Sequence, residues 1–205
     1  MIGIVIFTLL GYLSGDVLFA RIWGKLIGKT DVVSNSRDQN PGTANAYEQG
    51  GFWCGTLTLI CDLLKGFLPV FLYMYVTGDN AFYSLYEIPV LIAPVVGHIF
   101  PVMYRFRGGK GIAVTFGVLL ALFPALEPTL ALAICFIFFS LVIRIQPHFY
   151  RTLISYVVAF IVLCFTGDLI AVKTAFFIIT VIVCLRLHYS AETRERFKVG
   201  FLWMH

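Results

Sequence analysis

A glycine-rich basic segment is the first feature that could do chemistry. Residues 105–111 read Arg-Phe-Arg-Gly-Gly-Lys-Gly and precede an apolar run. Gly108, Gly109 and Gly111 expose backbone N–H groups without a hindering Cβ atom. The next helix is predicted to begin with unpaired N–H groups and a positive dipole end, beside the charge of Lys110. This combination predicts a phosphate site unlike the nucleotide P-loop, although a basic hairpin against anionic lipid headgroups is an alternative.

A long polar segment at residues 29–51 is the second candidate. Its centre reads Asn40-Pro41-Gly42-Thr43-Ala44-Asn45. Proline fixes φ and glycine permits positive φ, which is turn chemistry and fits a solvated connector. Irregular loops longer than about 12–15 residues are nevertheless uncommon unless they are functional or disordered. The loop is therefore a candidate functional segment as well as a possible connector.

Ionisable residues inside apolar segments form the third candidate. Asp62 and Lys65 share one helix face at i, i+3 spacing and can pair. Charged groups in lipid cost several kcal/mol and usually mark function, although an ion pair that locks helix packing is an equal alternative. Asp16, in the first apolar run, has the same two possible roles, functional or structural. His98 alone is a weak signal, because a hydrogen-bonded structural histidine is the commoner case.

Other catalytic patterns are missing from the sequence. The four histidines (98, 148, 188 and 205) are scattered, and the five cysteines lack metal-ligand spacing. No Ser-His-Asp or Cys-His arrangement is evident. We therefore expect no metal site, and no side-chain nucleophile is obvious.

The composition requires a membrane-embedded scaffold for these residues. Of the 205 residues, 60% are hydrophobic and only 13% are charged, whereas soluble domains carry about 25% charged residues. Too few charges remain to cover a water-facing surface. This excludes an ordinary soluble enzyme, a disordered segment and a soluble nucleic-acid-binding protein of the usual kind. We expect one all-α domain, residues 1–205, built as a polytopic membrane helix bundle.

Apolar runs of roughly 18 residues or more predict the membrane helices. Prolines in Phe123-Pro124 and Glu127-Pro128 should divide the longest run in two, and Gly167-Asp168 should separate the last two helices. Seven spans result, or five if short pieces are re-entrant or merged. The runs are residues 2–23, 52–76, 88–103, 111–143, 152–165 and 169–185.

The basic residues predict the orientation of the bundle. All of them except Lys65 and Lys173 fall in residues 21–51, 104–110, 144–151 and 186–205, on one side of the seven-span arrangement. Positive residues favour the cytoplasmic side. The N-terminus is therefore predicted outside and the C-terminus in the cytoplasm.

The motifs together resemble the bacterial acyl-phosphate:glycerol-3-phosphate acyltransferase family of polytopic membrane enzymes. The likeness covers nearly the whole chain. The most specific part of the likeness is the glycine-rich motif at residues 106–113, together with the histidine and proline that precede it. The segments that carry the likeness are Gly11-Tyr12-Leu13-Ser14-Gly15, residues 40–45, Asp62-x-x-Lys65-Gly66, Gly97-His98-x-x-Pro101 and Phe106-x-Gly108-Gly109-Lys110-Gly111-x-Ala113.

The resemblance implies a reaction and a set of site residues. A fatty acyl group would pass from acyl phosphate to the sn-1 hydroxyl of glycerol-3-phosphate, giving lysophosphatidic acid for phospholipid synthesis, without metal, cofactor or acyl-CoA. The enzyme would be a monomer in the plasma membrane, in contact with membrane lipid, with its site on the cytoplasmic side and no nucleic-acid partner. Lys110 and His98 would be catalytic, and Asp62 and Lys65 would support the site. The substrate-binding residues would be Asn40, Gly42, Asn45, Gly108, Gly109, Gly111 and His188.

The sequence departs from the family pattern on the acceptor side. Asp38-Gln39 stands where the family has Ser-Gly, and Glu48 stands where it has arginine. Of the C-terminal motif only His188 clearly carries over, with Arg194 and Arg196 near enough to compensate. Three hypotheses stay open: an active acyltransferase, a weak paralogue or one with an altered acceptor, and a small transporter on the same bundle.

Overall fold

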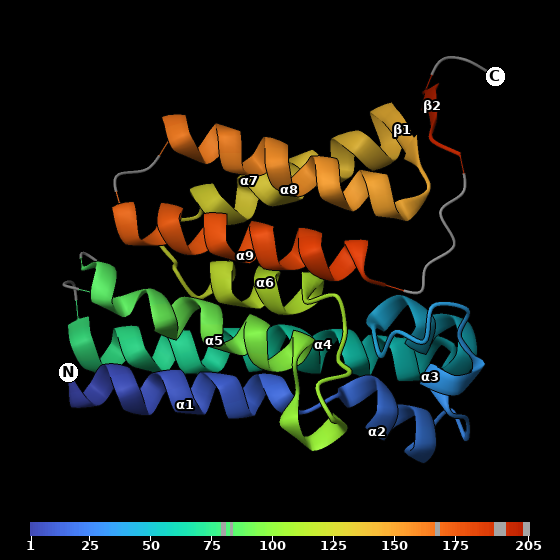
Figure 1. The fold of residues 1–205 in the computed structure, drawn as a ribbon, viewed down its shortest axis with the longest axis horizontal. Coiled ribbons are helices and arrows are strands. Elements are labelled where there is room, and N and C mark those ends of the chain that lie inside the picture. Colours follow the sequence, from blue (N-terminus) through green and yellow to red (C-terminus); the bar gives the residue numbers. More distant parts are fainter. Residues whose placement is uncertain (79–80, 83, 167–168, 191–195, 203–205) are drawn as a thin grey trace.

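The computed structural model describes residues 1–78, 81–82, 84–166, 169–190 and 196–202. Within these residues the fold is a layered bundle of roughly parallel helices with one two-stranded ribbon (Figure 1). The elements are α1 (Ile2–Asp16), α2 (Phe19–Leu26), α3 (Val32–Asn35), α4 (Thr43–Thr77), η2 (Leu85–Glu87), α5 (Ile88–Ile99), η3 (Val102–Tyr104), α6 (Ile112–Leu120), α7 (Glu127–Ile137), η4 (Phe138–Val142), β1 (Ile143–Gln146), α8 (His148–Phe165), α9 (Ile170–His188) and β2 (Lys198–Phe201).

The expected all-α membrane bundle is confirmed. Five helical stretches in the described chain are long and apolar enough to cross a membrane: Ile2–Leu26, Thr43–Thr77, Leu85–Tyr104, His148–Phe165 and Ile170–His188. The shorter apolar helices α6 and α7 pack in the same bundle. The two counts expected from sequence, five and seven, thus correspond to excluding or including these two helices.

Several boundaries differ from the expected ones. The first apolar run is two helices, because Val17 and Leu18 adopt extended backbone between α1 and α2. The helix expected from residue 52 begins at Thr43 and kinks at Gly51, whose φ is 81°. The expected division at residues 123–128 is confirmed by the ends of α6 and α7. The predicted break at Gly167-Asp168 lies outside the described residues.

The ribbon is an element that the periodicity did not predict. Strand β1 pairs antiparallel with β2, with Ile143 opposite Phe201 and Gln146 opposite Lys198. The apolar run 111–143 predicts that Ile143 ends a helix. Pairing with a distant segment takes this residue out of the helix instead, which local sequence cannot reveal.

The basic segments gather at one end of the bundle. The loop around α3, the turn after α5, the ribbon and the end of α9 all lie toward the side opposite the N-terminus (Figure 1). The C-terminal ends of α4, α6 and α8 lie at the other end. This alternation matches the arrangement that underlies the predicted orientation, whose direction across the membrane stays a prediction.

Glycines let the helices approach closely around the site. A Cβ atom on Gly15 would overlap the backbone of Pro94, and one on Gly97 would overlap the backbone of Tyr12, so α1 and α5 touch backbone to backbone. Gly66 and Gly117 make the same close approach between α4 and α6. Small residues at such crossings are the usual means of packing helices in lipid. Residues 97–111 and the start of α6 are thereby held against α1 and α4.

Replacing Gly117 with alanine tests this packing. Its Cβ atom would meet the carbonyl oxygen of Leu63, so the helix backbones must separate. We expect a loss of about 1–3 kcal/mol in the free energy of unfolding, the range for overpacked cores. Gly3→Ala is the control, since nothing lies within 4 Å of its added methyl group. Equal unfolding free energies of the two variants in detergent would refute the close-packing account.

Candidate active site

A cavity of about 510 Å³ lies between the α3–α4 loop, α4 and the start of α6. Its polar wall comes from the loop and from residues near the glycine-rich turn, and its apolar wall from α4 and α6. The lining residues are Asp38, Asn40, Gly42, Thr43, Ala44, Asn45, Leu59, Asp62, His98, Lys110, Gly111, Ile112, Ala113, Phe116 and His148. The cavity therefore offers polar groups beside an apolar groove.

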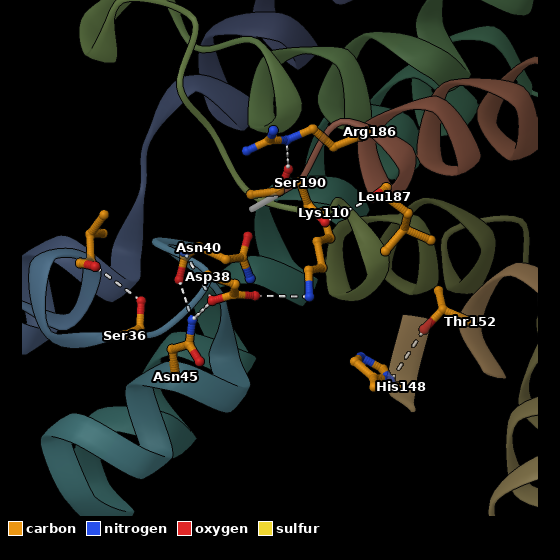
Figure 2. A network of polar contacts seen from close by, with 12 residues as sticks. Ser36, Asp38, Asn40, Asn45, Lys110, His148, Thr152, Arg186, Leu187 and Ser190 are labelled. Carbon is orange, nitrogen blue, oxygen red and sulfur yellow. Dashed lines mark hydrogen bonds and ion pairs between the residues drawn. The ribbon is translucent and has the colours of Figure 1, made fainter. Parts of the chain in front are cut away.

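An ion pair crosses the polar part of the cavity. Nζ of Lys110 lies 2.9 Å from Oδ2 of Asp38, and both side chains are largely buried (Figure 2). Nδ2 of Asn45 donates to Oδ1 of Asp38 at 2.7 Å and to the carbonyl of Asn40 at 2.8 Å. Burial alone would raise the pKa of Asp38, but the Lys110 charge and the donated hydrogen bonds outweigh it and lower that pKa below its usual value. Asp38 is thus a carboxylate fixed on Lys110.

The turn before α6 is held by its own backbone. The amides of Gly108 and Gly109 donate to the carbonyls of Ile99 and His98, and Arg186 donates to the carbonyls of both glycines. A Cβ atom on Gly109 would overlap the ring of His98. Both amides thus already have backbone acceptors in this structure, and their role in binding a phosphate stays a prediction. The glycines allow the turn to pack on His98 and so fix Lys110.

The start of α6 forms part of the cavity wall. Gly111 adopts a left-handed backbone with φ 82°, which favours glycine, and caps the helix. Gly111, Ile112 and Ala113 line the cavity, where first-turn amides have no helical partner. Gly111 thus stays a candidate anion-binding residue together with Lys110.

A buried polar cluster lies behind this wall. Nζ of Lys65 lies 2.8 Å from Oδ1 of Asp62 and 2.8 Å from Nδ1 of His98, and it also donates to the carbonyl of Val17 at 2.6 Å. Because an ammonium group only donates, Nδ1 of His98 accepts and the ring proton lies on Nε2. Asp62 and His98 line the cavity while Lys65 is hidden. The pair stays a predicted supporting element, now with a partner in His98.

The first helix supports the same region. The hydroxyl of Ser14 donates to the carbonyl of Lys65 at 2.9 Å. The carboxylate of Asp16 accepts from the amide of Met103 at 3.3 Å. The polar residues of α1 thus anchor α4 and the turn that carries Lys110, and Asp16 itself does not line the cavity.

Some predicted residues lie away from the cavity. His188 is exposed at the end of α9, and Glu48 and Arg196 are exposed as well. None of the three lines the cavity, and Arg194 lies outside the described residues. The negative charge that the sequence predicts near the phosphate site at Glu48 is instead contributed by Asp38, which lines the cavity and pairs with Lys110.

Sequence reasoning missed His148 and Arg186 as site residues. Nδ1 of His148 lies 3.0 Å from Nη2 of Arg151 and 3.3 Å from Oγ1 of Thr152, which orients the ring of this cavity-lining residue (Figure 2). Arg186 braces the glycine-rich turn from α9. Lone residues on distant helices carry no spacing signal that could have found them.

The described residues include no group of three His, Cys, Asp or Glu residues placed to hold a metal ion. A helical membrane bundle whose cavity combines a lysine, a helix N-terminus and an apolar groove defines a membrane protein suited to an amphiphilic anion. Comparison with known proteins narrows this class. The model of the family "Glycerol-3-phosphate acyltransferase" matches residues 5–196, and the chain belongs to that family.

Individual relatives agree with this assignment. Glycerol-3-phosphate acyltransferase of Endomicrobium trichonymphae is 35% identical over 136 residues, covering 65% of this chain and 66% of that protein. The enzyme of Paraburkholderia phytofirmans is 42% identical over 125 residues, covering 60% and 56%. The chain thus matches less than two thirds of the length of these relatives.

Solved structures show the same fold over most of the chain. The glycerol 3-phosphate form of PlsY, an integral membrane glycerol 3-phosphate acyltransferase, superposes with a TM-score of 0.77 at 25% identity, covering 90% of this chain and 88% of that one. Its lysophosphatidic acid form gives 0.74, covering 89% and 87%.

The buried cluster predicts a non-additive effect on stability. Lys65→Met leaves the Asp62 carboxylate without its ammonium partner and should cost about 3–5 kcal/mol of unfolding free energy. The double variant Asp62→Leu/Lys65→Met removes both charges and should cost less than the sum of the two single losses. Unfolding in detergent gives the free energies of unfolding of Asp62→Leu, Lys65→Met and the double variant.

Lys173→Met is the matched control. Lys173 lies near the start of α9 and donates to the carbonyl of Cys164, so its removal strands no carboxylate among the described residues. Additive losses for Asp62 and Lys65, or an equal loss for Lys173, would contradict a coupled buried pair.

Proposed function

We propose that this protein transfers a fatty acyl group from acyl phosphate to the sn-1 hydroxyl of glycerol-3-phosphate, giving lysophosphatidic acid. Family membership supports the acyltransfer. The carrying observation is the cavity itself, where Lys110 and the start of α6 adjoin the apolar residues Leu59, Ile112 and Phe116. A charged head and an acyl chain are the two parts of an acyl phosphate, and the cavity offers one wall to each.

The step needs positioning more than side-chain chemistry. The acceptor hydroxyl oxygen forms the ester bond to the acyl carbon while the bond from that carbon to the phosphate oxygen breaks. The hydroxyl proton leaves with the inorganic phosphate in the overall balance. Lys110 neutralises charge that builds on the departing phosphate, and the fixed geometry holds the reactants together.

The loop supplies groups for the acceptor. Oδ1 of Asn40 is buried without a hydrogen-bond partner, so it can accept from a hydroxyl group of the acceptor. Oγ1 of Thr43 is likewise buried without a hydrogen-bond partner. Asn45 acts indirectly, since its amide holds Asp38 and the carbonyl of Asn40. His98 positions the glycine-rich turn that carries Lys110.

The orientation of the site follows from the charges. The basic segments and the cavity lie at the same end of the bundle, and basic residues favour the cytoplasmic face. We place the site on the cytoplasmic side of the plasma membrane, in a protein that acts as a monomer.

The Asp38–Lys110 pair favours a second candidate function. A lysine already neutralised by a carboxylate binds phosphate less well, which fits a slow paralogue that binds acyl phosphate or lipid. Restored growth of a strain lacking its own acyltransferase would exclude a role limited to binding.

Lys110→Ala tests the proposed reaction. We expect a fall in kcat of about 10²–10³-fold, as for removal of one charge-stabilising donor, in lysophosphatidate formation by purified protein. Lys25→Ala is the control, because Lys25 is exposed on α2 and should leave the rate unchanged. No product from the wild-type protein, or equal rates for both variants, would overturn the proposal.

His148→Ala tests the residue that sequence reasoning missed. The hydrogen bonds to Nδ1 from Arg151 and Thr152 place the ring proton on Nε2, so the alanine variant loses a donor at the cavity wall. A fall in kcat/KM of about tenfold is expected, since one donor is worth about 1 kcal/mol or more. His148→Gln keeps an N–H donor and should retain more activity than alanine. If both variants match the wild type, His148 has no role in the site.

A further inference from the structure

The cavity contains an anion supplied by the protein itself. We propose that Asp38 is a specificity-determining residue, an internal counter-anion on Lys110 that the phosphate of a substrate must displace. The inference rests on the proposed function, because it concerns the phosphate-bearing substrates of that reaction. It goes beyond that function by assigning the affinity for phosphate to a residue that departs from the family pattern.

The two oxygens of Asp38 have separate tasks. Oδ1 accepts from the backbone N–H of Asn40 at 3.3 Å and from Nδ2 of Asn45 at 2.7 Å. Oδ2 lies 2.9 Å from Nζ of Lys110. One oxygen therefore anchors the loop and the other neutralises the lysine, so the two effects can be separated by a substitution that changes only one of them.

The charges of the cavity make this pairing decisive. Lys110 is the one Lys or Arg among the described residues that line the cavity. The other lining carboxylate, Asp62, is already matched by Lys65. Side-chain exposures of 9% for Lys110 and 13% for Asp38 leave little solvent to screen the pair. Asp38 thus opposes the positive charge that Lys110 would offer to a phosphate in the cavity.

Alternative chemistry for Asp38 fits less well. A general base works best when its pKa lies near the working pH, but the Lys110 charge and the donated hydrogen bonds lower the pKa of Asp38 despite its burial. The carboxylate is a weak base held on a cation. Competition with another anion is what this geometry provides.

Asp38→Asn separates the charge from the loop anchor. The amide oxygen of asparagine can keep both hydrogen bonds at Oδ1, while its NH₂ group replaces the oxygen that faces Lys110. We expect inorganic phosphate and glycerol-3-phosphate each to bind about tenfold more tightly to the full chain in detergent, measured by calorimetry. In the acyltransfer assay, KM for glycerol-3-phosphate should fall while kcat stays within about threefold.

Two further variants and one control complete the test. Asp38→Ser removes the charge without asparagine's shape and should also tighten phosphate binding, whereas Asp38→Glu keeps the charge and should bind phosphate as weakly as the wild type. Glu48→Gln makes the same change in net charge at an exposed residue outside the cavity and should change nothing.

The outcomes distinguish this inference from the proposed reaction. Unchanged or weaker phosphate binding by both charge-removing variants, at wild-type melting temperature, overturns the inference. A hundredfold loss of kcat with unchanged KM overturns it too, since that is the signature of a base. If no variant turns over, the proposed function fails, and the binding comparison still decides the role of Asp38.

Discussion

The packing of the helices around the cavity depends on the contacts that the ammonium group of Lys65 makes. This group joins the carbonyl of Val17 where α1 ends, the carboxylate of Asp62 on α4 and the ring of His98 on α5. A charge in this position must keep all its partners, because an unpaired one in lipid is costly. Three helices are thereby fixed relative to one another. The ring that Lys65 orients is the ring on which Gly109 packs, so the position of Lys110 is set by a charge that the cavity does not expose.

Much of the helical arrangement could be predicted from sequence, because long apolar runs indicate membrane helices. The all-helical bundle, the break at residues 123–128 and the pairing of Asp62 with Lys65 all follow from local patterns. The ribbon, His148 and Arg186 depend on contacts between distant segments, for which spacing gives no signal. The glycine-rich turn adds a packing role that the sequence did not indicate: Gly109 lies against the ring of His98, and the amides of Gly108 and Gly109 donate to backbone carbonyls.

The acceptor side shows why charge must be placed in space before it is interpreted. Two carboxylates depart from the family pattern, and sequence alone gives Glu48 the greater weight because it replaces an expected arginine. In the fold, Glu48 is exposed and does not line the cavity, whereas Asp38 pairs with Lys110. The same net charge has opposite significance at the two positions, since only a group within a few ångströms and shielded from water changes the binding of an anion.

The ribbon has a consequence for how the cavity wall is built. Strand β1 ends at Gln146, two residues before His148, and pairs with β2, which follows α9. A wall residue contributed by the middle of the chain is therefore positioned by backbone from residues 198–201. This pairing can form only after residues 198–201 have been synthesised, and these follow α9 in the chain. A nascent chain that already contains α8 and α9 would therefore still lack the support that β2 gives to the cavity wall at His148.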